Sequence, residues 1–161
     1  MTMILDGSAG VTFPNSTVQA SAGQVLQVVN ATYGTQVTSS STTLVDTGLT
    51  ATITPKFSTS KILVLVSQNG CDSSAGNADN GLTLSLYRNS TLINLFALAL
   101  GYTNTTLRQI QSASTVYLDS PATTSAVTYK TQFGQWNTSV ASVAVNANGV
   151  SSTITLMEIA A

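Results

Sequence analysis

The sequence K-I-L-V-L-V-S-Q, from Lys61 to Gln68, decides the fold of this chain. Its five apolar residues, Ile62 to Val66, stand unbroken between polar ends, and the run is too short for a helix. A strand that exposes one face to water alternates apolar and polar residues, so this strand should be buried on both faces. One face should meet the core of the domain. The other is most simply covered by a neighbouring subunit, which predicts a homo-oligomer.

Short apolar strand patterns, separated by turn residues, continue on both sides of this segment over residues 24–161. About eight to ten such strands, without an amphipathic helix, are typical of an all-β antiparallel two-sheet sandwich, most simply a jelly roll. An immunoglobulin-like sandwich is the alternative. Alternation with polar residues predicts a set of inward-facing positions: Leu49, Ala51, Ile53, Leu82, Leu84, Leu86, Val127, Tyr129 and Phe133.

Three segments between these strands are harder to assign. The run from Leu92 to Leu100, closed by Gly101, fits either a strand or a short helix with a glycine cap, and its neighbours favour a strand. Asp46-Thr-Gly48 has the composition of a turn. The glycines and small polar residues from Asn69 to Asn80 predict a surface loop.

The first residues of the chain, Met1 to Gly23, differ from the rest because they are short, extended and punctuated by glycine. Pro14 prevents a helix here. The apolar points Val11, Phe13 and Val18 are spaced for two short strands around a Pro-Asn-Ser turn, and they have no core of their own. We therefore expect an anchoring arm that binds a partner through Val11, Phe13, Pro14 and Val18. A poorly ordered terminus is the alternative.

The charge composition argues against several classes of partner. Charged residues make up 7% of the chain, its five basic residues are scattered, and its net charge is -1. No patch could neutralise a run of phosphates, so nucleic acid is not an expected partner. No signal peptide is apparent, and no window reaches the roughly 18 apolar residues of a membrane helix. The single cysteine, Cys71, cannot form an internal disulfide, which favours folding in a reducing compartment such as a cytoplasm.

Catalytic chemistry is poorly supported by the sequence. The chain contains no histidine, which excludes Ser-His-Asp and Cys-His catalysis and histidine-ligated metals. Cys71 has no basic sequence neighbour to lower its pKa. We expect no enzymatic activity and no cofactor. The acidic residues fall at predicted turns, loops and a chain end rather than in an evident pair: Asp6, Asp46, Asp72, Asp79, Asp119 and Glu158.

Two weaker candidate sites remain. The segment from Asp72 to Gly81 carries oxygen ligands that Ca²⁺ could use, but its spacing does not match an EF-hand, and we predict a solvated loop without metal. Trp136, in G-Q-W-N-T, could stack on a sugar, anchor a subunit contact, or be buried in the core. We take Leu63, Leu65 and Trp136 as the candidates for a subunit interface.

Several of these segments together resemble a known family. G-V-T-F-P-N-S-T-V-Q, from Gly10 to Gln19, resembles a motif near the start of many tailed-bacteriophage virion proteins. Four further segments follow in order between Asp46 and Ile159: D-T-G-L-T-A-T-I-T-P, S-K-I-L-V-L-V, Y-L-D-S-P-A-T-T-S-A-V-T-Y-K and I-T-L-M-E-I. This series resembles a phage jelly-roll module of tumour-necrosis-factor-like type. The resemblance implies a homotrimer on a virion.

Modules of this type occur as proteins that decorate or cement a capsid and as tips of tail fibres. The chain begins with its own Met1 and offers about two dozen residues ahead of the module, enough to grip a capsid surface but not to build a shaft. We therefore expect a trimeric capsid decoration protein that binds the major capsid protein or another virion protein. The alternative is a tail-fibre or receptor-binding tip, with a host surface glycan as its partner.

Overall fold

The computed structural model describes residues 4–6, 10–12, 18–19, 23–73, 80–103, 105–137 and 141–161, with side chains from residue 23 onward. Three short strands precede the main body: β1 (Ile4–Asp6), β2 (Gly10–Thr12) and β3 (Val18–Gln19). The main body contains β4 (Val25–Tyr33), β5 (Val37–Ser39), β6 (Val45–Ile53), β7 (Lys61–Ser73), β8 (Leu82–Arg88), β9 (Thr91–Leu100), β10 (Gln109–Asp119), β11 (Val127–Gln135), β12 (Val143–Val145) and β13 (Ser152–Ile159). The 3₁₀ turn η1 (Ala147–Gly149) separates β12 from β13.

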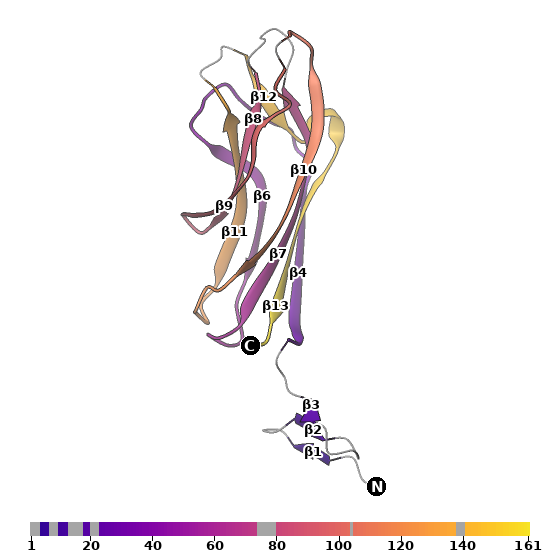
Figure 1. Ribbon diagram of the computed structural model, residues 1–161, viewed down its shortest axis with the longest axis vertical. Helices are drawn as coiled ribbons and strands as arrows, with labels where there is room; N and C mark the ends of the chain where they lie inside the picture. The colour runs from indigo at the N-terminus through magenta and orange to yellow at the C-terminus, as the bar shows by residue number, and fades with distance from the viewer. Residues whose placement is uncertain are drawn as a thin grey trace.

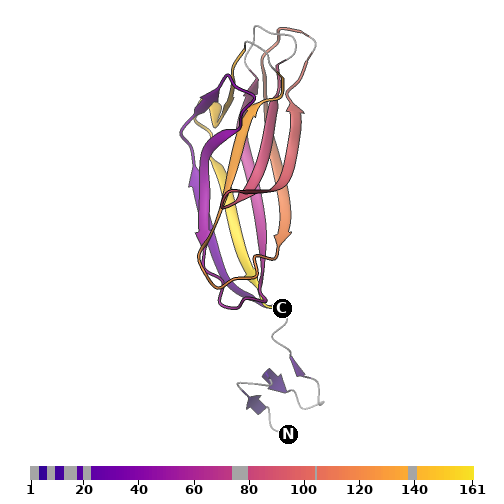
Figure 2. The same cartoon turned by 90° about the vertical axis from the view of Figure 1, so that its left-hand side faces the viewer.

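The strands of the main body form two antiparallel sheets (Figures 1 and 2). One sheet has the order β4-β13-β7-β10, and β5 and β12 extend β4 and β13 along the same edge of β7. The other has the order β6-β11-β8-β9. With β4 and β5, and β12 and β13, each counted as one strand, this is the topology of an eight-stranded jelly roll. The predicted all-β, two-sheet sandwich is confirmed.

The core lies between the two sheets, and the predicted inward-facing residues form the side of it that one sheet contributes. All nine of them are at most 6% exposed: Leu49, Ala51, Ile53, Leu82, Leu84, Leu86, Val127, Tyr129 and Phe133. The apolar residues divide into two clusters, one around Val64 and Leu156 and the other around Phe133 and Val145. Alternation of apolar and polar residues therefore identified the inner face of one sheet correctly, on its strands β6, β8 and β11.

The predictions for the three ambiguous segments had mixed outcomes. The run from Leu92 to Leu100 lies within strand β9, as its neighbours suggested. The predicted turn at Asp46-Thr-Gly48 is wrong, because these residues lie inside β6, where the register against β11 shifts. Gly48 has a φ of 87°, and a Cβ there would overlap the ring of Tyr33. The glycine therefore marks a β-bulge under an aromatic side chain rather than the end of a strand.

The predicted loop from Asn69 to Asn80 is also wrong in its first part. β7 continues to Ser73, because Cys71 and Asp72 pair with β10 and Asp72 also pairs with β12. These long-range pairings hold small and polar residues in a strand despite their local preference for a loop.

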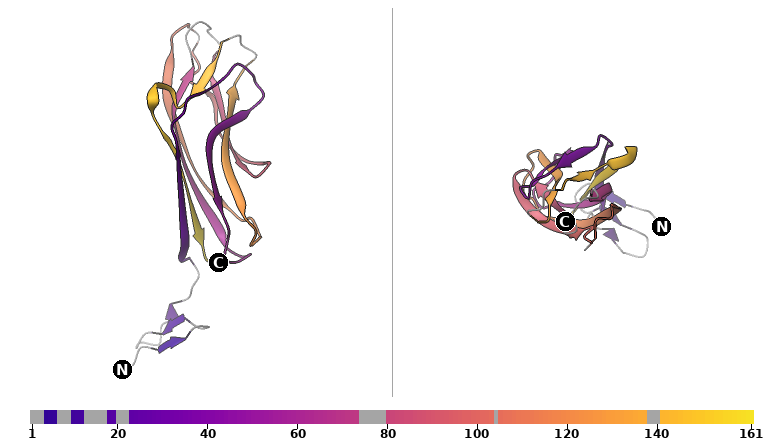
Figure 3. Two further views of the ribbon diagram at one scale, coloured as in Figure 1. Left: turned by 180° about the vertical axis from the view of Figure 1, so that it is seen from behind. Right: turned by 90° about the horizontal axis from the view of Figure 1, so that it is seen from above.

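In the N-terminal segment, β2 and β3 pair antiparallel, as the sequence predicted, and β1 adds a strand that it did not. Figure 1 shows this small sheet apart from the sandwich, beyond the end where β4 begins. The C-terminus lies at that same end (Figure 3), and the Gly23 N–H donates a 2.8 Å hydrogen bond to the Ala160 carbonyl.

Candidate interaction surface

Strand β7 has two apolar faces. Ile62, Val64 and Val66 point into the core and are at most 4% exposed. Leu63 and Leu65 lie on the opposite face of the sheet and are only half-buried. The predicted burial of this strand is therefore confirmed for its inner face, whereas burial of its outer face is not complete within one chain.

The neighbouring strands place further apolar residues beside Leu63 and Leu65. Met157 of β13 pairs with Leu63 on one side and with Val28 of β4 on the other. Leu118 of β10 pairs with Leu63 across its other edge, which completes a row of four apolar residues over the whole sheet. In the next row, Leu65 pairs with Val116.

We call these six residues the outer apolar face: Val28, Leu63, Leu65, Val116, Leu118 and Met157. Three of them remain more than half exposed: Val28 at 54%, Val116 at 67% and Leu118 at 52%. Contiguous apolar patches of this kind usually mark an interaction site on a soluble protein.

A polar row bounds the outer apolar face. Thr32, Thr153, Ser67 and Ser114 pair with one another in order across the same four strands, two residues further along each. Hydroxyl side chains suit a solvated sheet surface. The outer face of this sheet is thus divided along its length into an apolar part and a polar part. The apolar part lies where β4 begins and β13 ends.

The opposite sheet presents a smaller apolar stripe on β9, which is an edge strand. Leu92 and Leu95 are both 50% exposed and Leu98 is 61% exposed. An edge strand with exposed leucines is a site for association with another chain. The run from Leu92 to Leu100 therefore exposes apolar side chains outside the core.

Trp136 does not join the outer apolar face. It follows β11 in the other sheet and is 37% exposed. Its ring meets that of Tyr102 edge-to-face, with centroids 5.3 Å apart and an interplanar angle of 72°, and its backbone N–H donates to the Gly81 carbonyl. Of the three residues predicted for an interface, Leu63 and Leu65 lie together and Trp136 lies elsewhere, in an exposed aromatic pair.

The predicted binding residues of the arm are only partly described. Val11 lies in β2, opposite Gln19, and Val18 lies in β3, opposite Thr12. Phe13 and Pro14 lie outside the described residues. The pairing of β2 with β3 brings Val11 and Val18 onto neighbouring strands, on either side of the segment that contains Phe13.

Three carboxylates are engaged by cations at separate places in the sandwich. Arg88 Nη1 donates to Asp119 at 2.9 Å, and Lys130 Nζ lies 2.8 Å from Asp46. Arg108 donates to Asp72 through Nε and Nη2, with the Nη2 bond at 2.7 Å. Each of these carboxylates thus accepts charge-assisted hydrogen bonds from its own cation. Three of the five basic residues are used in this way.

The structure describes only part of the possible calcium site, since residues 74–79 lie outside the described ranges. Asp72 belongs to β7 and is held by Arg108, and Asp79 lies outside the described residues. Among the residues with described positions, no three of the Cys, Asp and Glu side chains come together as a metal site would require. Likewise, no helix in the described ranges has the length and apolar character needed to cross a membrane.

Cys71 is a core residue. It is 2% exposed and packs with Leu82, Leu84 and Phe133. Burial raises the pKa of its thiol to about 12, although a backbone hydrogen bond from Ala113 opposes the shift. A buried thiol with a raised pKa has little thiolate at neutral pH, which is the form that reacts as a nucleophile.

Sequence analysis missed four of the six residues of the outer apolar face: Val28, Val116, Leu118 and Met157. The signal was present in part, because Val116 and Leu118 alternate with Thr115 and Tyr117. Only the strand register shows that these positions adjoin Leu63 and Leu65, and the register between two strands distant in the sequence cannot be predicted from either strand alone.

Comparison with protein-family models and with curated proteins gives no match. Among solved structures, the chain is similar to that of infectious bursal disease virus Gx strain, at 12% identity and a TM-score of 0.40, over 85% of this chain and 39% of that one. It is also similar to the infectious bursal disease virus VP2 subviral particle, at 15% identity and a TM-score of 0.37, over 84% and 38%. The chain spans about two-fifths of the length of these structures, and the likeness concerns the sandwich fold alone.

Proposed function

We propose that this chain is a non-enzymatic structural protein of a virion, which assembles as a homotrimer and decorates the outer surface of a capsid. The outer apolar face is the observation that carries the proposal. Six apolar residues in register over four strands, three of them more than half exposed, would be a liability in a free monomer. Copies of the same chain provide a cover that is always present at the same concentration.

The scarcity of charge supports the same conclusion. Only 7% of the residues are charged, and three of the five basic side chains are held in ion pairs within the chain. A small protein with so little net charge gains solubility and protection of its sheet edges when it is part of an assembly. The phage-like segments of the sequence favour a virion as that assembly.

The N-terminal arm is the proposed attachment element. It forms its own small sheet ahead of the sandwich (Figure 1), and its residues Val11, Phe13, Pro14 and Val18 supply the apolar contacts. The major capsid protein is the proposed partner.

Immunogold electron microscopy of particles tests this proposal. Antibody against this chain should label the whole capsid surface of intact particles. A particle preparation without bound label, in which the antibody still detects the purified protein, would refute the virion assignment.

A tail-fibre or receptor-binding tip is the second candidate, and one observation favours it. Tyr102 and Trp136 form an exposed aromatic pair, with exposures of 46% and 37%. Exposed aromatic rings are suited to stacking against sugars. Gold label confined to tail tips would favour this role over capsid decoration.

A further inference from the structure

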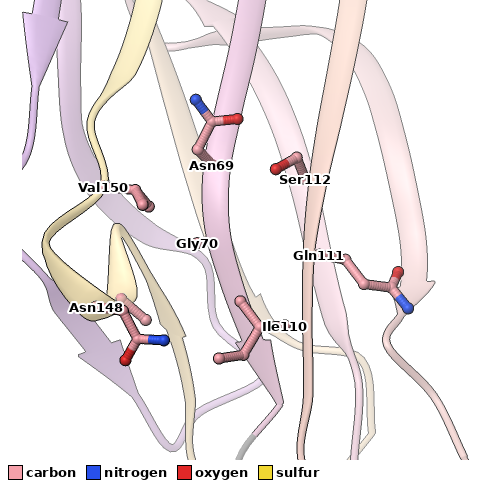
Figure 4. Close-up of a pocket in the computed structure, with 8 residues that line it drawn as sticks. Asn69, Gly70, Ile110, Gln111, Ser112, Asn148 and Val150 are labelled. Carbon is pink, nitrogen blue, oxygen red and sulfur yellow. The ribbon is translucent and has the colours of Figure 1, made fainter.

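A pocket of about 490 Å³ lies on the polar part of the sheet formed by β4, β13, β7 and β10. Its floor is Asn69 and Gly70 of β7, one wall is the segment 110–112 of β10, and the other is η1 with Val150 (Figure 4). This volume lies within the range of small-molecule sites. The pocket is separate from the outer apolar face, because the row that contains Ser67 and Ser114 lies between them.

Irregularities of three strands meet at this pocket. The register of β10 against β7 shifts between Gln111 and Ala113. On the other side, η1 interrupts the strand formed by β12 and β13, and Asn148 within it has a φ of 60°. Between them, Gly70 has a φ of 58°. Bulges and left-handed residues cost energy and gather at functional sites.

Gly70 is required by the close approach of η1 to β7. A Cβ at this position would lie 2.5 Å from the Ala147 nitrogen and 2.7 Å from Val150 Cγ2. The approach is fixed further by the Asn146 N–H, which donates to the Asn69 carbonyl at 3.0 Å. The pocket walls are therefore held in place by backbone contacts rather than by flexible side chains.

The polar groups of the pocket are uncharged and partly free. The Ser112 hydroxyl and the Asn148 side-chain amide make no hydrogen bond within the described part of the chain. The orientation of the Asn69 side chain is fixed by two hydrogen bonds. Its Nδ2 donates to the Ser151 carbonyl at 2.8 Å, and its Oδ1 accepts from Ser67 Oγ at 3.2 Å. In Figure 4 the Ser112 side chain is turned toward Asn69, whereas the Gln111 amide extends away from Gly70.

Apolar surface completes the lining. Ile110 is 43% exposed and Val150 is 41% exposed, and they stand on opposite walls. In Figure 4 the Ile110 side chain extends from β10 toward η1. The pocket thus combines two aliphatic surfaces with a hydroxyl and an amide, and none of the described residues that line it is charged.

We infer that this pocket binds a neutral sugar ring. A pyranose presents hydroxyl groups that both donate and accept, which match the free amide of Asn148 and the hydroxyl of Ser112. Its C–H surface can pack on Ile110 and Val150. The absence of charge in the lining disfavours phosphorylated or carboxylated ligands. An extended peptide is less well suited, because β7 and β10 already use their backbone groups to pair with each other. This inference stands independently of the proposed role on a virion.

Saturation-transfer difference NMR on the full-length protein tests the inference, with glucose, galactose, mannose and N-acetylglucosamine as probes. At least one of these sugars should give a signal at millimolar concentration, and glucuronate should give a weaker one. The double variant Ser112→Ala with Asn148→Gly should weaken binding at least about fivefold, as expected from the loss of two hydrogen bonds. Glycine is chosen at residue 148 because it keeps the left-handed backbone.

Ser114→Ala is the matched control, because Ser114 lies on the same strand and face but outside the pocket. It should leave the signal unchanged, and all variants should melt at the temperature of the wild type. Two results would overturn the inference: no signal from any neutral sugar at tens of millimolar, or an undiminished signal in the double variant. Hydrogen-exchange protection of residues 110–112 that rises with protein concentration would also overturn it, since the pocket would then be covered by another copy.

Discussion

Thr131 Oγ1 donates a 2.9 Å hydrogen bond to Gln68 Oε1 in the middle of the sandwich, and both side chains are fully buried. Thr131 belongs to β11 and Gln68 to β7, so this bond joins the two sheets. The Thr131 hydroxyl also lies 2.6 Å from that of Thr47. Gln68 Nε2 donates to Ser152 Oγ at 2.8 Å, which in turn donates to Asn146 Oδ1 at 2.6 Å. An uncharged polar network therefore lies within the interior of the sandwich.

Removal of the Thr131 hydroxyl should destabilise the fold. In Thr131→Val, Gln68 Oε1 loses its donor and Thr47 loses a hydroxyl partner within a buried site, which typically costs about 1 to 3 kcal/mol. Thr128→Val is the control, because the Thr128 hydroxyl bonds to Thr52 at 2.8 Å between the same two strands but in contact with solvent. Its effect should be below about 0.5 kcal/mol. Urea unfolding measures both, and equal losses would show that the buried network contributes nothing special.

The burial of Gln68 in this network could not be predicted from the sequence. Gln68 was assigned to the polar end of the central strand, where it would be expected to meet water. Its amide is instead buried because β7 continues for five further residues to Ser73 and pairs with β10 and β12. By contrast, Leu49 and Ile53 were placed correctly, because each strand carries its own inside-outside pattern. Local pattern defines faces, whereas burial of a polar residue depends on partners distant in the sequence.

The outer apolar face should hold the oligomer together. Wild-type protein at micromolar concentration should have three times the mass of the 16.6 kDa chain by sedimentation equilibrium. The double variant Val116→Asp with Leu118→Asp should be a folded monomer, because two carboxylates would have to be buried without partners in the interface. Neither residue contributes to the core of its own chain, so the unfolding transition should remain cooperative.

The control for this variant is Thr50→Asp with Thr52→Asp, which places two carboxylates at the same spacing on exposed positions of β6, in the other sheet. That variant should remain a trimer. Two results would contradict the prediction: a wild-type protein that sediments as a monomer, or a Val116 and Leu118 variant that stays trimeric. Either would show that the outer apolar face is not the subunit interface.

Stability should fall in acid, in part through Glu158. Burial alone would raise the pKa of Glu158, but hydrogen bonds from the Gln27 side chain, at 2.5 Å, and from the Lys56 N–H, at 2.7 Å, help to bring it below the ordinary value of 4.5. A carboxyl group whose pKa is lowered by folding stabilises the fold above its unfolded pKa. This contribution is lost as the pH falls through the lower, folded value.

Thermal unfolding from pH 7 downward checks this expectation. The melting temperature of the wild type should drop most steeply below about pH 4.5, and Glu158→Gln should flatten this drop. Asp46→Asn serves as the control, because Asp46 also has a lowered pKa but its side chain is 55% exposed, so solvent screens its ion pair with Lys130. If both variants change the acid slope equally, the buried position of Glu158 is not the cause.

The N-terminal arm should be dispensable for folding and essential for attachment. The sandwich has its own core between the two sheets, formed by side chains of its own strands. Phe13 could bury about 150 Å² against a partner, which corresponds to roughly 3 to 4 kcal/mol before the cost of ordering the segment. A single arm would therefore hold weakly, whereas three arms on one trimer could raise the avidity by about 10² to 10⁴.

Deletion of residues 1–22 should accordingly leave the melting temperature and the trimer unchanged and abolish recovery of the protein with purified particles. The Gly23 N–H is kept in this variant because it donates to the Ala160 carbonyl and closes the end of the sandwich. Phe13→Ala in the full chain is the finer test. In the trimer, each of the three arms loses its largest contact. The substitution should therefore lower the occupancy of the protein on particles by a larger factor than it lowers the affinity of one isolated arm peptide. Normal decoration by the truncated protein would place the attachment surface on the jelly roll itself.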